Sequence, residues 1–267
     1  TDFEVVHYKI EFKNLPPEFD GFRIAHISDL HLGSFSDPKD VEKGFLLLMN
    51  EKPDIILISG DMVNNQAEEL YPMMETLKEL KAPYGVYSIL GNHDVGDYRR
   101  WATIKEKEAD IKTLIATQQA VGIIMLIDEN VLLKKGNDSM ALIGVNSWEN
   151  PPFNRYGNLK KAMKGIENIS FKILITHSPS HWDEEVMGKT DISLTLSGHT
   201  HAMQMGINCC GLFWSPMAWF YQHWAGLYKY NEQYLNVNRG FGYVGFPGRI
   251  GMTPEITIIE LKRKQLP

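Results

Sequence analysis

The fold of this chain can be worked out from Phe22–His31 (FRIAHISDLH), where an apolar run of strand length is followed by Asp29-Leu30-His31. Asp54–Asp61 (DIILISGD) repeats this arrangement, and Val86–Asp94 (VYSILGNHD) repeats it again. Helical spacing fills the gaps, over Pro38–Asn50 and Glu68–Leu80. Strands that alternate with helices of this length predict βαβ units and a largely parallel sheet in the N-terminal half.

The C-terminal half is predicted to be richer in strands. Val131–Lys135 and Met140–Val145 flank Gly136-Asn137-Asp138, a pattern typical of a β-hairpin. The remaining expected elements are a polar helix over Asp97–Ala120 and apolar strands at Phe171–Thr176, Ile192–Ser197, Tyr234–Asn238 and Glu255–Leu261. No Pro-, Gly- or Ser-rich linker divides the chain. We therefore expect one α/β domain over residues 1–267, built as two mixed β-sheets packed in a sandwich and flanked by helices.

Composition narrows the class of protein. The 267 residues carry a net charge of −6, which argues against a protein that mainly holds nucleic acid phosphates. The two cysteines, Cys209 and Cys210, are adjacent, so a disulfide framework is excluded. No apolar run is long enough to span a membrane. The chain begins at Thr1, and an upstream signal or anchor stays open. We expect a bacterial cytoplasmic or peripheral membrane protein.

Side chains that bind metals follow five of the expected strands. They are Asp29 with His31, Asp61, Asn92 with His93 and Asp94, His177, and His199 with His201. In open α/β sheets, ligands bind outside the carboxyl ends of the strands, so these side chains are expected to converge on one edge. The positions Asp29, Asp61 and Asn92 are separated by 32 and 31 residues, which is close to one βαβ unit each.

The donor set indicates the kind of metal. It mixes the oxygens of Asp29, Asp61 and Asn92 with several imidazoles, and this mixture suits Mn, Fe or Zn better than Ca or Mg. Seven donors are too many for one ion. The sequence therefore predicts two divalent metal ions a few ångströms apart, bridged by one carboxylate.

In this order, DLH, GD, GNHD, a single His and GHTH resemble the motifs of the calcineurin-like metallophosphoesterase superfamily, from about Phe22 to the final strand. The resemblance implies hydrolysis of a phosphate ester or anhydride by water between two metal ions. It also implies that His93 acts as acid or transition-state donor, with Asp94 as its partner. It assigns Asp29, His31 and His201 to the first metal, Asp61 to both, and Asn92, His177 and His199 to the second.

The resemblance extends to a branch of the superfamily. The motif GNHD, where a protein Ser/Thr phosphatase is expected to have GNHE, argues against that group of the superfamily. The stretch from NRGFG to PEITIIEL resembles bacterial UDP-2,3-diacylglucosamine diphosphatase-like and cell-envelope phosphoesterases. The expected substrate is a phosphodiester or pyrophosphate in a phosphate-containing small molecule or lipid-linked envelope compound. The alternatives are a soluble phosphodiesterase or nucleotidase acting on nucleotides, and a metal-stabilised binding module without turnover. The oligomeric state stays open.

The segment Leu212–Trp224 (LFWSPMAWFYQHW) is the most unusual stretch of the chain. It is either a core-packing helix and loop, or an apolar lid that binds a lipid tail or contacts a membrane surface, where Trp is favoured. Its lack of Lys and Arg weakens any preference for anionic lipids. On the second interpretation Trp214, Trp219 and Phe220 contact substrate. Arg249, before the last strand, is either a phosphate contact or a structural residue.

Overall fold

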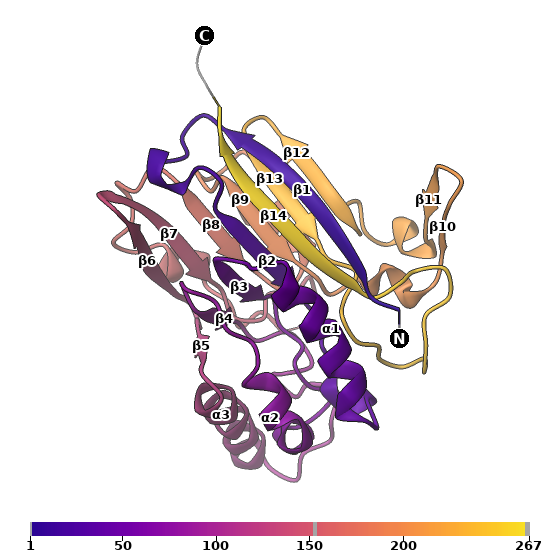
Figure 1. Cartoon of the computed structure of the whole chain (residues 1–267). Coiled ribbons are helices and arrows are strands. Elements are labelled where there is room, and N and C mark those ends of the chain that lie inside the picture. The colour runs from indigo at the N-terminus through magenta and orange to yellow at the C-terminus, as the bar shows by residue number, and fades with distance from the viewer. Residues whose placement is uncertain (1, 152–153, 265–267) are drawn as a thin grey trace.

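The framework of the protein is two six-stranded mixed sheets packed face to face (Figure 1). The computed structural model describes residues 2–151 and 154–264. The first sheet has the order β1-β14-β2-β3-β4-β5, and its strands β2 to β5 are parallel. Its strands are β1 (Glu4–Phe12), β2 (Arg23–Ile27), β3 (Ile55–Ile58), β4 (Val86–Ser88), β5 (Ile123–Met125) and β14 (Glu255–Arg263).

The second sheet has the order β12-β13-β9-β8-β7-β6, with a parallel centre and an antiparallel strand at each edge. The predicted hairpin is present, and the pairing of Lys135 with Asp138 leaves Gly136 and Asn137 as a two-residue turn. The strands are β6 (Glu129–Lys135), β7 (Asp138–Gly144), β8 (Lys172–Ile175), β9 (Leu194–Ser197), β12 (Gly226–Tyr230) and β13 (Gln233–Val237).

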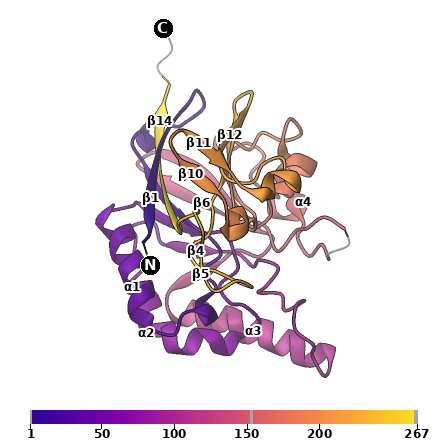
Figure 2. The same ribbon diagram turned by 90° about the vertical axis from the view of Figure 1, so that its right-hand side faces the viewer.

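Helices cover the outer faces of the two sheets. Figures 1 and 2 show α1 (Pro38–Asn50), α2 (Met74–Leu77) and α3 (Ile104–Ala120) on the side of the first sheet. The short helices α4 (Leu159–Ala162) and α5 (Pro179–His181) lie on the second sheet, where α5 continues into a π turn at Trp182–Val186. This arrangement confirms the predicted helix-flanked sandwich.

The inner strands of the two sheets, such as β3, β8 and β9, are buried on both faces, and this burial stabilises the sandwich. In β3, Ile55 and Leu57 point into the core between the sheets, whereas Ile56 and Ile58 point toward α1 and α2. Successive side chains of a strand point to opposite faces, so a continuous apolar run is what a strand covered on both sides requires. A one-residue shift in strand pairing would turn each side chain to the opposite face, so burial on both faces helps to keep the strands that carry the metal-binding motifs in register.

Some predicted elements differ from the structure. The helix expected over Asp97–Ala120 begins at Ile104, because the side chain of Thr103 caps it by accepting a hydrogen bond from the backbone N–H of Glu106. The helix expected over Glu68–Leu80 is a 3-10 helix at Ala67–Met73 followed by one α-helical turn, since Pro72 interrupts the backbone hydrogen bonds. Strands β1, β5 and β12 were not predicted, nor were β10 (Ile207–Cys209) and β11 (Leu212–Trp214).

Phe171 is expected to be a major contributor to the core between the sheets. It is fully buried and packs edge-on against Phe12, with ring centroids 4.9 Å apart. Phe171→Ala is expected to lower the free energy of unfolding by about 3–5 kcal/mol, measured by urea denaturation. Leu132→Ala, at a 39% exposed position of β6, is the control and is expected to cost about 0.5 kcal/mol or less. Equal losses for the two variants would contradict the packing described here.

Candidate metal centre

The sequence-predicted metal-binding residues come together where the two sheets meet. Asp29, His31, Asp61 and Asn92 follow the carboxyl ends of β2, β3 and β4, and His177, His199 and His201 follow β8 and β9. Each of the two metal-binding clusters described below therefore contains residues from both sheets. The structure thus places these side chains together at one edge of the molecule.

The backbone is strained at this edge. Five of the gathered residues have left-handed backbone conformations, which side chains other than glycine rarely adopt: Asp29, His31, Asp61, His199 and His201. Backbone hydrogen bonds hold them there, including His31 N–H to the Asp61 carbonyl at 3.0 Å. Glycines allow the close approach. A Cβ added to Gly91 would lie 2.1 Å from Oδ1 of Asp61, and one added to Gly198 would lie 2.2 Å from Oδ2 of Asp29.

The first cluster consists of Asp29, His31 and His201, all of which are buried. Nε2 of His201 lies 3.2 Å from Oδ1 of Asp29. Nε2 of His31 lies 3.1 Å from Nε2 of His201, a separation at which two ring nitrogens need a proton or a cation between them. Burial, aided by the charge of His201, lowers the pKa of His31 to about 3. The neutral imidazole that results is the form that binds metals.

The second cluster contains Asp61 and His177, with Asn92 and His199 beside them. Nε2 of His177 lies 3.1 Å from Oδ2 of Asp61. Nδ1 of His199 lies 2.8 Å from Oδ1 of Asn92. Burial, aided by the charge of His177, lowers the pKa of His199 to about 3, so this ring is also neutral at pH 7.

Asp61 lies between the two clusters. Its Oδ2 is 3.7 Å from Nε2 of His31 and 3.1 Å from Nε2 of His177. Burial opposes ionisation of this carboxyl, but the charges of His177 and His93 outweigh burial and hold its pKa below the usual value. An ionised carboxylate is thus available to both clusters.

Hydrogen bonds behind the clusters orient the histidines. Nδ1 of His177 contacts the Ser59 carbonyl at 2.7 Å, and Nδ1 of His31 contacts Oδ1 of Asn64 at 3.0 Å. These contacts leave Nε2 of each ring facing the site, which is how metal-binding histidines are held in proteins. The buried carboxylates and the imidazole nitrogens that face them fit a pair of divalent ions.

His93 stands at the rim of the first cluster. Its ring is stacked on Tyr98 with centroids 4.3 Å apart, and its Nδ1 lies 2.7 Å from the Asn64 carbonyl. One ring nitrogen each of His93 and His31 and one carboxylate oxygen of Asp61 lie within 4.8 Å of one another. The backbone N–H of His93 donates a hydrogen bond to Oδ1 of Asp61 at 2.9 Å. Tyr98 and the Asn64 carbonyl therefore fix the orientation of the ring, and its Nε2 stays available for a hydrogen bond to a ligand.

The expectation that Asp94 pairs with His93 is wrong. The turn after Asn92 directs the Asp94 carboxylate back beneath the next loop, where it accepts four backbone N–H groups, from Asp61, Met62, Val63 and Gly91, at 2.8 to 3.2 Å. Burial and the neighbouring Asp61 raise the pKa of Asp94 to about 7. Asp94 thus shapes the loop that carries Asp61.

Two residues that the sequence reasoning missed lie beside His199. The hydroxyl of Tyr221 is 2.8 Å from Nε2 of His199, and Oε2 of Glu149 is 3.6 Å from the same nitrogen. Burial raises the pKa of Glu149 to about 7. Glu149 follows β7, so the rule that ligands follow strand ends would have found it had it been applied to this strand. No sequence signal marked Tyr221, because it is one of several aromatic residues in the segment Leu212–Trp224 and follows no predicted strand.

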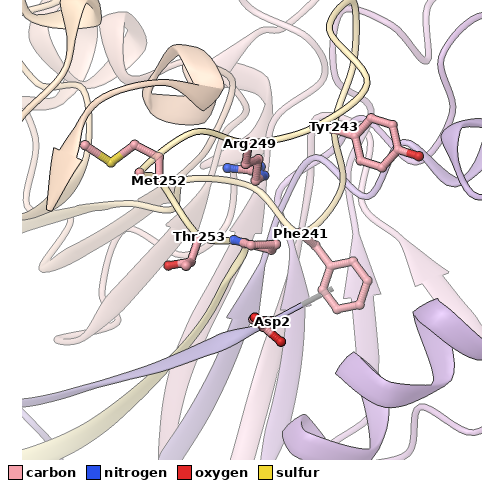
Figure 3. A pocket seen from close by; sticks show the side chains of 9 residues that line it. Asp2, Phe241, Tyr243, Arg249, Met252 and Thr253 are labelled. Atoms are coloured by element: carbon pink, nitrogen blue, oxygen red, sulfur yellow. The ribbon is translucent and has the colours of Figure 1, made fainter.

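The Arg249 guanidinium is engaged by the backbone. It donates to the carbonyls of Arg239, Gly240 and Gly242 at 2.6 to 3.0 Å, and one Nη lies 3.4 Å from Nδ1 of His201. Arg249 and Phe241 line a cavity of about 310 Å³. Figure 3 shows these side chains from close by. These contacts favour the structural alternative for Arg249, because they hold its loop against His201.

The aromatic segment is mostly at the surface. Trp214 is 36% exposed, Trp219 74% and Phe220 70%, so the core-packing interpretation is wrong for these residues. Trp214 ends the hairpin of β10 (Ile207–Cys209) and β11 (Leu212–Trp214), Trp219 ends the 3-10 helix Pro216–Trp219, and Phe220 follows that helix. Figure 1 shows this hairpin standing apart from the two large sheets. Among the described residues, no helix is long and apolar enough to cross a membrane.

Comparisons with known proteins agree with this geometry. A model of the calcineurin-like phosphoesterase family matches residues 22–203. The "Transmembrane protein with metallophosphoesterase domain" of Danio rerio is 28% identical over 97% of this chain, which spans 57% of that relative's length. Phosphodiesterase YaeI of Escherichia coli (strain K12) is 26% identical, again over 97% of this chain and over 88% of its own.

A solved structure supports the fold alone. The NAD nucleotidase of Haemophilus influenzae superposes with a TM-score of 0.55 at 14% identity, over 82% of this chain and 45% of that one. The family match is stronger, because it covers more than half of the chain and includes every strand-end motif from Asp29 to His201. This protein therefore belongs to the calcineurin-like phosphoesterase family, whose members use divalent metal ions.

Proposed function

We propose that this protein hydrolyses a phosphodiester or pyrophosphate bond at a pair of divalent metal ions. The observation that carries the proposal is the position of Asp61, whose Oδ2 lies 3.7 Å from His31 and 3.1 Å from His177. One ionised carboxylate between two histidine clusters suits a bridge between two ions. When bound, such ions supply a water of low pKa and positive charge for the phosphoryl oxygens.

The proposed ligands follow the two clusters. Asp61 is shared, and the donor set suits Mn, Fe or Zn. The first ion is assigned to Asp29, His31 and His201, and the second to Asn92, His177 and His199.

His93 is proposed to serve the leaving group. Because the Asn64 carbonyl only accepts hydrogen bonds, Nδ1 of His93 carries a proton. Nε2 is then the atom that gives a proton or a hydrogen bond to the leaving oxygen when the imidazole is doubly protonated. The stacked ring of Tyr98 holds His93 in the required orientation.

We further propose that the substrate is lipid-linked and is taken from a membrane surface. The exposed side chains of Phe213, Trp214, Trp219 and Phe220, here called the aromatic surface, belong to a stretch that contains no Asp, Glu, Lys or Arg from residue 202 to 228. Trp and Phe are favoured where membrane and water meet. The surface is joined to the site through Tyr221 and His199. A relative named as a transmembrane protein supports action at a membrane.

Removing the aromatic surface is expected to weaken membrane binding. Burying such a side chain fully contributes about 1.5–3 kcal/mol, so Trp219→Ser with Phe220→Ser is expected to reduce binding to phosphatidylcholine vesicles about tenfold or more. Vesicle co-sedimentation measures the effect. Ile104→Ser, at a 79% exposed position of α3, is the matched control and is expected to bind as the wild type does. Unchanged binding of the double variant would favour the soluble phosphodiesterase or nucleotidase.

A further inference from the structure

Glu149 is a buried acid at the metal centre that the seven proposed ligands leave unused. It follows β7, the neighbour of β8 in the second sheet, and is 2% exposed. A carboxylate oxygen of Glu149 and one ring nitrogen each of His177 and His199 all lie within 4.8 Å of one another. Nδ1 of His199 lies 2.8 Å from Oδ1 of Asn92, and its Nε2 lies 3.6 Å from Oε2 of Glu149.

One oxygen of the Glu149 carboxylate, Oε1, is buried and has no hydrogen-bond partner within the described part of the chain. The guanidinium of Arg155 donates to the backbone carbonyl of Glu149 at 2.8 Å rather than to its carboxylate. Across residues 2–151 and 154–264, its one ion-pair contact is with His199. A buried carboxylate oxygen with no hydrogen-bond partner is unfavourable unless a cation lies beside it, so this position favours a cation.

We propose that Glu149 is an additional ligand of the second metal ion, so that this position offers two carboxylates, Asp61 and Glu149, beside Asn92 and two histidines. The inference rests on the proposed function. Three oxygen donors with two imidazoles suit a five- or six-coordinate ion better than the four-coordinate arrangement that Zn²⁺ prefers. The second position is therefore selective for a harder ion such as Mn²⁺.

The test is a metal titration of the whole chain after chelation, followed by calorimetry with Mn²⁺ and with Zn²⁺. The wild type is expected to bind two ions. Glu149→Gln keeps the shape of the side chain and is expected to bind the first ion normally and the second about 100-fold more weakly, with a larger loss for Mn²⁺ than for Zn²⁺. Glu184→Gln removes the same charge at an exposed position and is expected to match the wild type.

Two further variants test whether Glu149 binds the metal ion itself or only orients His199. Tyr221→Phe removes the hydroxyl from Nε2 of His199 and keeps the Glu149 carboxylate, so it is expected to bind the second ion about tenfold more tightly than Glu149→Gln. Glu149→Asp keeps a carboxylate and is expected to recover part of the lost affinity. Equal losses in Tyr221→Phe and Glu149→Gln, or no recovery in Glu149→Asp, overturn the assignment.

The failure of this inference is distinguishable from failure of the proposed function. If the wild type binds two ions and Glu149→Gln binds both with unchanged affinity, only the role of Glu149 is lost. If the wild type itself binds fewer than two ions, the two-metal function fails with it. The affinity for the first ion and the thermal unfolding midpoint report whether each variant is folded.

Discussion

Asp61→Asn is expected to lower kcat/KM for a phosphodiester about a thousandfold. The carboxylate of Asp61 lies between His31 and His177, so its neutral amide replacement takes negative charge from both proposed metal positions. Metal ions contribute several kcal/mol of transition-state stabilisation, and about 1.4 kcal/mol corresponds to each factor of ten in rate. Loss of one well-placed ion therefore removes about three orders of magnitude.

Metal analysis of the same samples identifies the cause of this loss. Asp61→Asn is expected to retain fewer than two ions per chain. Asp40→Asn is the control, because Asp40 pairs with Lys43 on the surface of α1 and lies in neither cluster. It is expected to keep both its metal and its activity. Full activity with two bound ions in Asp61→Asn would contradict the bridging role.

His93→Ala is expected to lower kcat by about 10²–10⁴-fold while both ions stay bound. The ring packs edge-on against His31, but it stacks on Tyr98 and its hydrogen bond goes to the Asn64 carbonyl, so its removal should leave the proposed ligands in place. A donor to the leaving oxygen is needed most when the leaving group is a poor one. The loss should therefore be larger for an alkyl ester than for a p-nitrophenyl ester.

The same variant separates the enzyme from the metal-stabilised binding module. Turnover lost with metal retained supports an enzyme. A variant that behaves as the wild type does in every assay supports the module. His7→Ala, at a surface ion pair with Glu51, is the control for loss of an imidazole and is expected to be fully active.

The sequence predicted most of the site because the signal was local. An apolar run such as Asp54–Ser59 needs two covered faces, and parallel strands share one carboxyl edge, so Asp29, Asp61 and Asn92 had to be close. The same reasoning placed His177 and His199 at the end of the second sheet. That residues 1–267 form one domain stays a prediction, as do the individual roles of the ligands.

What the sequence did not predict depends on contacts between distant segments. Strand β1 pairs in parallel with β14, at the other end of the chain, and its mixed polar sequence gives little sign of this. The partner of Asp94 depends on the direction of a turn, which places its carboxylate against the backbone near Asp61. Tyr221 reaches His199 through the fold of a surface hairpin, a contact that spacing along the chain cannot reveal.

The most direct test of the central claim is hydrolysis of bis-p-nitrophenyl phosphate against p-nitrophenyl phosphate, first in metal-free buffer and then with Mn²⁺ added. The proposed function predicts no turnover without metal, and turnover of the diester once two ions are bound. Metal analysis of the same protein confirms that the ions are present. Ready cleavage of the monoester with no cleavage of the diester, at two bound ions per chain, would contradict it.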